Sequence, residues 1–321
     1  MIDPEQHNLW PTTPEPSPPT RAISSAPPVM ERSGIAQEFD RSALPAVNVA
    51  SVPQRSPLRY PGGKTWLIPH IRKWLGDGPP TPLLMEPFAG GGIVSLTSVM
   101  EGRANRALMV DLDRDVSAFW RAALDHSEDL IARILAFSPD RDGVEQLARQ
   151  APQSVLDHGF RTLVLNRTRR GGVLAPGASL TRHGENGGGL CSRWYPDTLA
   201  KRLRDIARHA DRLLFYEGNG VGMLDTFADY PETKFFVDPP YTAAGGKRAG
   251  SRLYRHNTVD HARIFHTLAR SHADFLMTYD YSSQVVELIR EHHFHAVVVD
   301  MKNGHHARIP ELVITRDSLF S

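Results

Sequence analysis

In Phe235-Phe236-Val237-Asp238-Pro239-Pro240-Tyr241 an apolar run ends in an aspartate, two prolines and a tyrosine. Its apolar residues predict a buried strand, and the prolines prevent that strand from continuing. Asp238 therefore falls at the carboxyl end of the strand, where open α/β sheets bind their ligands. The Asp238 carboxylate, the Pro239 carbonyl, the stiff turn at Pro240 and the flat ring of Tyr241 are candidates for holding a planar base that bears an amino group. A surface turn with a capping aspartate is the alternative interpretation.

A glycine-rich turn follows an earlier apolar run, in Leu83-Leu84-Met85-Glu86-Pro87-Phe88-Ala89-Gly90-Gly91-Gly92. It predicts a strand, a turn and the start of a helix, the first unit of a doubly wound sheet that lets a nucleotide-like ligand approach. The spacing differs from G-x-G-x-x-G, which disfavours a nicotinamide cofactor. A second strand ends in Asp111, about 20 residues further on, where a carboxylate accepts hydrogen bonds from ribose hydroxyls. Glycines needed only for a tight turn are the alternative.

Two glycines precede a lysine in Ser56-Pro57-Leu58-Arg59-Tyr60-Pro61-Gly62-Gly63-Lys64, where we expect the ordered chain to begin. Such glycines let the backbone approach a ligand closely, but the spacing of a P-loop is missing. A helix is predicted through Trp66 to Trp74. Further helices are predicted around 115–124, 127–136, 153–167, 198–211, 259–271 and 282–291.

The last two predicted strands, 296–300 and 309–315, are separated by a loop too short for a crossover helix. They should therefore form an antiparallel pair at the end of the sheet. Together with strands at 212–217 and 274–280, this predicts an α/β fold with a Rossmann-like methyltransferase sheet, mostly parallel and closed by an antiparallel hairpin. A nicotinamide-binding Rossmann domain lacks that hairpin.

Basic residues gather between Arg161 and Arg212, where eleven Lys and Arg face four acids and leave a local charge of +7. With Trp194 and Tyr195 nearby, this glycine-rich stretch fits phosphate contact plus base readout, although a solvated basic face is an equal alternative. A second basic loop, containing Lys247 and Arg248, follows the Asp238 turn and either clamps a polyanion or is an ordinary flexible loop.

Composition excludes several classes of function. The chain has 321 residues, a net charge of +1 and one cysteine, so it has no internal disulfide and no cysteine-based zinc site. The fifteen histidines lack the spacing of a closed metal site, and we expect no metal. No apolar run reaches transmembrane length and no apolar signal segment is present, so we expect a soluble cytoplasmic protein without a membrane partner. The Pro- and Ser-rich residues 1–55 predict a disordered tail.

Four stretches now occur in the order typical of one family: Arg59-Tyr60-Pro61-Gly62-Gly63-Lys64, Glu86 to Gly92, Asn166-Arg167-Thr168 and Asp238-Pro239-Pro240-Tyr241. Over about 56–315 the chain resembles the DNA adenine methylases in which the cofactor motif precedes the catalytic DPPY, and Glu311-Leu312-Val313-Ile314 is similar as well. The resemblance implies S-adenosylmethionine-dependent methylation of the exocyclic amino group of adenine in double-stranded DNA, with the base flipped out, by a protein expected to be a monomer. It divides the chain into a catalytic domain (56–118 and 212–321) and an inserted target-recognition region (119–211).

The resemblance also distributes roles over residues. Catalysis falls to Asp238, Pro239, Pro240 and Tyr241. Cofactor binding falls to Tyr60, Gly63, Lys64, Glu86, Pro87, Phe88, Gly90, Gly92, Asp111, Asn219 and Asp238. DNA binding falls to Asn166, Arg167, Thr168, Arg169, Arg170, Lys247 and Arg248.

One position departs from the family pattern, because Asn219 stands where an acid usually contacts the cofactor adenine. The alternatives are a catalytically weak or inactive DNA-binding protein on the same scaffold, and a methyltransferase acting on another amino group, such as cytosine or an RNA base.

Overall fold

The computed structural model describes residue 39 and residues 51–60, 63–175, 177–184, 187–240, 259–302 and 308–318, with backbone alone at 300–302 and 308–310. Every described residue belongs to one compact unit, Ala36–Ser321. The predicted tail therefore lies almost wholly outside the described residues, as do Tyr241, Lys247 and Arg248.

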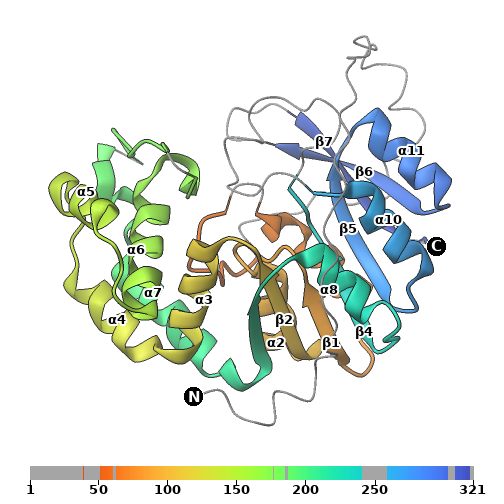
Figure 1. Ribbon diagram of the computed structural model, residues 1–321, viewed down its shortest axis with the longest axis horizontal. Helices are drawn as coiled ribbons and strands as arrows, with labels where there is room; N and C mark the ends of the chain where they lie inside the picture. The colour runs from red at the N-terminus through yellow and green to blue at the C-terminus, as the bar shows by residue number, and fades with distance from the viewer. Residues whose placement is uncertain are drawn as a thin grey trace. The chain divides into compact units, whose positions relative to one another are not determined.

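In the described residues, seven strands form one sheet in the order β3-β2-β1-β4-β5-β7-β6. They are β1 (Thr81–Glu86), β2 (Ala104–Asp111), β3 (Leu213–Glu217), β4 (Thr233–Val237), β5 (Asp274–Asp280), β6 (His295–Lys302) and β7 (Arg308–Thr315) (Figure 1). The five strands β1 to β5 pair in parallel. The strand order reverses between β1 and β4, which makes the carboxyl ends of these two strands the switch point where such sheets bind ligands.

The terminal hairpin is present. β7 pairs antiparallel with β6 and also with β5, so it lies between them. This arrangement confirms the predicted fold class, a mostly parallel α/β sheet with an antiparallel hairpin. β7 lies next to β5 because β7 returns along the sheet without a crossover. This position brings Glu311 of β7 opposite Asp280 at the carboxyl end of β5.

Helices cover both faces of the sheet. One core cluster joins residues of α1 (Ile68–Leu75), α2 (Ile93–Met100) and α3 (Arg114–Asp125) to the sheet through Phe236. The other joins α8 (Gly220–Phe227), α10 (His261–Arg270) and α11 (Ser283–Glu291) through Phe235. Successive side chains of a strand point to opposite faces, so the adjacent phenylalanines of β4 anchor the two layers separately.

The predicted insertion is helical where it is described. Its elements are α4 (Ser127–Ala136), α5 (Arg141–Arg149), α6 (Val155–Thr168) and α7 (Pro196–Ala207), with short 3₁₀ turns η5 (Arg170–Gly172), η7 (Gly189–Arg193) and η8 (Ala210–Arg212). The boundary predicted at 118/119 falls inside α3, which continues to Asp125 and packs against α6. Apolar residues of α6 and α7 belong to the same core cluster as α2, so the insertion shares its core with one face of the sheet.

Two helices were missed from the sequence. α5 contains Gly143 and α8 contains Gly220 and Gly222, and glycine has a low helix propensity. Both helices begin at a side-chain cap, where Asp140 accepts from Gly143 N and Asn219 accepts from Val221 N.

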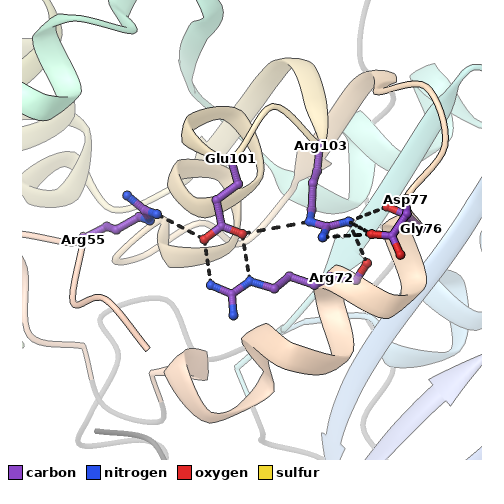
Figure 2. Close-up of polar contacts among 6 residues, drawn as sticks. All are labelled: Arg55, Arg72, Gly76, Asp77, Glu101 and Arg103. Carbon is purple, nitrogen blue, oxygen red and sulfur yellow. Dashed lines mark hydrogen bonds and ion pairs between the residues drawn. The ribbon is translucent and has the colours of Figure 1, made fainter. Parts of the chain in front are cut away.

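A segment that we call the strap (residues 51–60) leads into the 3₁₀ helix η4 (Lys64–Leu67). Figure 2 shows how the strap is attached at Arg55, whose guanidinium contacts Glu101 at 3.1 Å beside the C-terminus of α2. Glu101 also binds Arg72 of α1 with both carboxylate oxygens, at 2.7 and 2.8 Å. Arg103 lies at 4.0 Å from Glu101 and also contacts Asp77 and the Gly76 carbonyl. The strap is therefore tied to the sheet domain by a cluster of charges.

Candidate functional site

A cavity of about 860 Å³ opens at the switch point of the sheet. Small-molecule sites typically have volumes of roughly 300–1,000 Å³. Its lining brings together most of the residues predicted to bind cofactor or substrate: Tyr60, Gly63, Lys64, Glu86, Pro87, Phe88, Gly92, Asp111, Asn219, Asp238 and Pro240. Residues of the strap and of the insertion close the cavity from the other side, among them Arg59, Arg167, Gly172 and Arg202.

Asp238 lies directly after β4 and is held by two donors. Lys64 Nζ lies 2.8 Å from Asp238 Oδ2, and Thr278 Oγ1 donates to Asp238 Oδ1 at 2.8 Å. Thr278 comes from the neighbouring strand β5. The Asp238 side chain is 23% exposed, so the carboxylate is fixed in orientation and still faces the cavity.

Lys64 is buried and lies between two carboxylates. Besides Asp238 it contacts Glu311 Oε1 of β7 at 3.1 Å, and both Lys64 and Glu311 are almost inaccessible to solvent. Burial alone lowers the pKa of a lysine, but the charges of Asp238 and Glu311 outweigh it and raise the pKa of Lys64 above its usual value. Lys64 was predicted as a cofactor residue; it lines the cavity and also contacts the proposed catalytic carboxylate.

Two residues of this cluster were not assigned a role from the sequence, Thr278 and Glu311. A carboxylate inside the apolar run of β7 was the available signal for Glu311, since a charged group is rarely buried unless it is paired. No local signal marked Thr278, because a threonine inside a strand is ordinary.

The glycine turn after β1 is shaped by close contacts. Gly90 and Gly92 have φ angles of +45° and +61°, in the left-handed region that favours glycine. A Cβ on Gly90 would lie 2.7 Å from the Tyr60 ring, and one on Gly92 would lie 2.8 Å from Met109 Sδ. The turn thus leaves room for Tyr60 on one side and for the core on the other.

Asp111 organises the same turn. Its two carboxylate oxygens accept hydrogen bonds at 2.9 Å, one from Gly90 N and one from Asp113 N. Burial raises the pKa of Asp111 to about 6, although these backbone donors act in the opposite direction. Each carboxylate oxygen keeps a second lone pair, so Asp111 can still accept from a ligand hydroxyl in the cavity.

Glu86 ends β1 and is the most deeply buried acid of the cavity lining. Ser95 donates to Glu86 Oε2 through its backbone N at 3.0 Å and its hydroxyl at 2.5 Å. Burial raises the pKa of Glu86 to about 8, because these hydrogen bonds offset the loss of solvation only in part. Glu86 therefore keeps its proton at neutral pH, and the acidic character of the cavity lining comes from Asp111 and Asp238.

Asn219 lines the cavity at the start of α8. Its Oδ1 accepts from Val221 N at 3.0 Å, and its amide group has further donor and acceptor capacity. The following Gly220 lies against the turn after β1, since a Cβ there would be 2.0 Å from the Pro87 carbonyl oxygen. The replacement of an acid by asparagine therefore removes a charge and keeps a helix cap.

The motif predicted to contact DNA through Asn166 and Thr168 lies in the interior, which corrects that prediction. Both residues are fully buried. The Thr168 hydroxyl donates to Val164 O within α6, and the Asn166 amide binds backbone groups of two other segments. The prediction was wrong because the sequence of a polar motif on a helix does not indicate whether that motif faces solvent or the core.

The arginines that follow have different positions. Arg167 is buried and lines the cavity, Arg169 donates to Leu174 O at 3.0 Å, and Arg170 is exposed. Only Arg170 of these three is fully accessible to a polyanion in this conformation.

Neither a metal centre nor a membrane span is found in the part of the chain that the structure describes. No group of three or more His, Cys, Asp or Glu is placed there to hold a metal ion. None of the helices described is both long enough and apolar enough to cross a bilayer.

Comparison with known proteins identifies one family. Residues 60–150 match the family model of the D12 class N6 adenine-specific DNA methyltransferases, which confirms the predicted resemblance over those residues. The match supports a methyltransferase whose methyl donor is S-adenosylmethionine. No curated protein matches the chain.

Several solved structures are similar to this chain at low sequence identity and low TM-score. A precorrin-6y C5,15-methyltransferase from Geobacter metallireducens GS-15 is 10% identical, with 79% of this chain and 88% of that chain covered and a TM-score of 0.35. A putative RNA methyltransferase from Pyrococcus horikoshii is 10% identical over 88% and 95%, with a TM-score of 0.36. An rRNA methyltransferase from Streptomyces viridochromogenes is 16% identical over 86% and 88%, with a TM-score of 0.36. At these scores the likenesses carry no argument about function.

Proposed function

We propose that this protein is a D12 class DNA methyltransferase that transfers the methyl group of S-adenosylmethionine to the exocyclic amino nitrogen of adenine. The observation that carries the proposal is the Asp238 carboxylate, fixed by Lys64 and Thr278 at the end of β4 and open to the cavity beside the glycine turn. The family match over residues 60–150 supports the same activity.

The cavity fits S-adenosylmethionine in volume, charge and shape. Its positive sulfonium suits a lining that contains the carboxylates of Asp111 and Asp238. The glycine turn packs closely against Tyr60, since a Cβ on Gly90 would lie 2.7 Å from its ring, and Tyr60 and Gly92 both line the cavity. Asp111 and Asn219 would hold the nucleoside part, and the acids near the glycine turn would hold the cationic part. The bound cofactor supplies an activated methyl group.

Asp238 would accept a hydrogen bond from the amino group of the target base, and the Pro239 carbonyl would accept the second. Two acceptors orient the nitrogen lone pair towards the methyl group and hold the reacting atoms in line. Lys64 and Thr278 fix the orientation of the Asp238 carboxylate, which would act as the acceptor before transfer. The nitrogen would take the methyl group as the bond between that methyl and the sulfonium sulfur breaks, with a neutral thioether as the leaving group. The nitrogen would then carry the positive charge, and one of its protons would leave through the hydrogen bond to Asp238.

An adenine inside a duplex is out of reach of this cavity, so the base would be flipped out of double-stranded DNA. Tyr241 would stack on the flipped base. Exposed basic residues such as Arg170, with Lys247 and Arg248 after the catalytic turn, would contact the phosphates. We propose that the protein acts on DNA as a monomer in the cytoplasm.

Substitution of the catalytic aspartate tests the proposal. We expect Asp238→Ala to lower methyl incorporation from radiolabelled S-adenosylmethionine into plasmid DNA by about 10²–10⁴-fold. Circular dichroism and cooperative urea unfolding serve as the control that the variant is folded. Incorporation near the wild-type rate would refute the catalytic assignment.

The product identifies the substrate. Nucleoside analysis of the methylated plasmid should give N6-methyladenine, whereas N4-methylcytosine or label in RNA alone would support the alternative amino groups. Wild-type protein that binds DNA without incorporating label would support a scaffold without chemistry.

A further inference from the structure

The strap is held by the insertion through its backbone. Asn166 of α6 accepts from Arg59 N at 2.7 Å and donates to Arg59 O at 2.8 Å, so both polar groups of one peptide residue are bound by one side chain. Asn166 also donates to Gly172 O at 2.8 Å. Arg202 of α7 donates to Ser56 O at 2.8 Å and adds a second attachment.

This arrangement leaves little freedom for the strap. Asn166 is fully buried, which strengthens its hydrogen bonds and makes an unmade one costly. Gly172 lies so close that a Cβ there would be 2.3 Å from Arg59 O. On its other side the strap is tied to the sheet domain by Arg55 and Glu101 (Figure 2).

The residue after Arg59 is Tyr60, which forms a wall of the cavity. Its ring lies against Gly90, and Gly90 N donates to Asp111 while Gly90 O accepts from Trp120 Nε1 at 2.9 Å. A shift of the Arg59 backbone would therefore displace Tyr60 from the glycine turn. The insertion reaches the cofactor cavity by a continuous path of contacts through Asn166, Arg59 and Tyr60.

We infer that Asn166 is a positioning residue for the cofactor site, acting through the strap to hold Tyr60 on the glycine turn. This inference rests on the proposed function, because it assigns the cavity to S-adenosylmethionine. It differs from the role predicted for Asn166, since the side chain binds protein backbone in the interior and contributes to cofactor affinity in the absence of DNA.

The test is cofactor affinity without DNA. Asn166→Asp keeps an acceptor for Arg59 N and replaces the donor to Arg59 O and Gly172 O with a second acceptor. We expect its dissociation constant for S-adenosylhomocysteine, measured by calorimetry, to rise by at least about tenfold. With DNA present, the KM for S-adenosylmethionine should rise more than kcat falls.

Val164→Ala is the matched control. Val164 is also fully buried on α6, but it lies two residues away and so faces the opposite side of the helix. It should lower the melting temperature and leave the dissociation constant within about twofold of wild type. Equal weakening by Val164→Ala would overturn the inference, because the effect would then follow from general destabilisation.

A second variant keeps the inference testable if Asn166→Asp does not fold. Gly172→Ala pushes on Arg59 O from the insertion and should weaken cofactor binding in the same way. Wild-type affinity in a folded Asn166→Asp or Gly172→Ala protein would overturn the inference. Wild-type protein that fails to bind S-adenosylmethionine or S-adenosylhomocysteine would instead refute the proposed function.

Discussion

Two clusters of charge attach the N-terminal part of the fold to the sheet, and they have opposite composition. At the cavity, one cation, Lys64, lies between the carboxylates of Asp238 and Glu311. Beside α2, one carboxylate, Glu101, lies among the guanidinium groups of Arg55, Arg72 and Arg103 (Figure 2). The Lys64 side chain is 4% exposed, whereas that of Glu101 is 19% exposed and its arginines are 22–31% exposed.

The difference in exposure determines whether water can replace a lost partner. A buried charge must be paired with another protein group, whereas a partly exposed charge can be solvated instead. A buried charge that loses its partner keeps the full cost of desolvation, whereas a half-exposed charge is resolvated. The Lys64 cluster therefore combines stability with the orientation of the catalytic carboxylate. The Glu101 cluster is a structural attachment whose strength should depend on salt.

The largest expected effect comes from breaking the buried cluster. Lys64→Met leaves Asp238 and Glu311 close together without the cation, and we expect unfolding free energy to fall by about 3–5 kcal/mol. Methyl transfer should be lost as well, because Asp238 loses a donor that orients it. Urea unfolding and the plasmid methylation assay measure the two effects.

Lys234 provides the matched control at the other end of β4. It contacts Asp274 at 3.1 Å, and its side chain is 24% exposed. Lys234→Met should cost about 1 kcal/mol or less and leave methyl transfer unchanged. If Lys64→Met and Lys234→Met lost equal stability and equal methyl transfer, the buried Lys64 cluster would not differ from the more exposed Lys234 pair.

An intermediate effect is expected at the exposed cluster. Burial opposes ionisation of Glu101, but hydrogen bonds from Arg72 and Arg55 outweigh it and lower its pKa. We expect Glu101→Gln to lower unfolding free energy by about 1 kcal/mol at neutral pH and low salt, with methyl transfer little changed.

Two dependences sharpen this prediction for Glu101. Because the folded pKa is lowered, the stabilisation is present above the ordinary value of 4.5 and is lost as the pH falls through the folded pKa. It should also shrink between low salt and about 1 M salt, where the screening length is about 3 Å. A loss that is independent of both salt and pH would show that Glu101 acts through packing.

A pH-dependent effect is expected at Glu86, a buried carboxylate that, in the described part of the chain, is held by Ser95 hydrogen bonds and not by a cation. Its pKa is raised from 4.5 to about 8, so the folded state retains a proton that the unfolded state releases. Stability from this group is therefore lost as pH rises between about 4.5 and 8. Glu86→Gln removes that loss.

Calorimetric melting of Glu86→Gln across pH 5 to 9 checks the sign. The unfolding free energy of the variant should rise relative to that of wild type as the pH rises, by on the order of 1–2 kcal/mol at pH 8. Parallel melting curves at all pH values would show that Glu86 ionises in the fold without penalty. If wild type instead became more stable than the variant as the pH rises, the upward shift assigned to the pKa of Glu86 would be wrong.

Much of the architecture followed from the sequence. The acids that end β1 and β2, the prolines after β4 and the short loop before β7 predicted the strands, the cavity edge and the antiparallel hairpin, and these are present. The helices at 115–124 and 127–136 were predicted to within a residue or two of α3 and α4. Local periodicity and turn chemistry suffice for such elements, because they depend on neighbours in the chain.

The partners of buried polar groups did not follow from the sequence. Lys64 was assigned to the cofactor, and its ammonium group contacts the Asp238 carboxylate. Asn166 was assigned to DNA, and its side chain binds the backbone of the strap. Glu311 joins the site from a strand more than 240 residues away in the chain from Lys64, because β7 inserts next to β5. No local pattern specifies contacts of that range.

The sequence by itself determined where the strands end and which residue types gather at the ends of the parallel strands. It marked Asp238-Pro239-Pro240-Tyr241 as a rigid turn beyond a buried strand, since those properties are carried by the peptide backbone and by neighbouring residues. Only the tertiary structure decided that the Asp238 carboxylate is held by Lys64 and Thr278 and that the insertion reaches the cofactor cavity through Asn166. Burial and pairing arise when distant segments exclude water together, and that condition exists only in the folded chain.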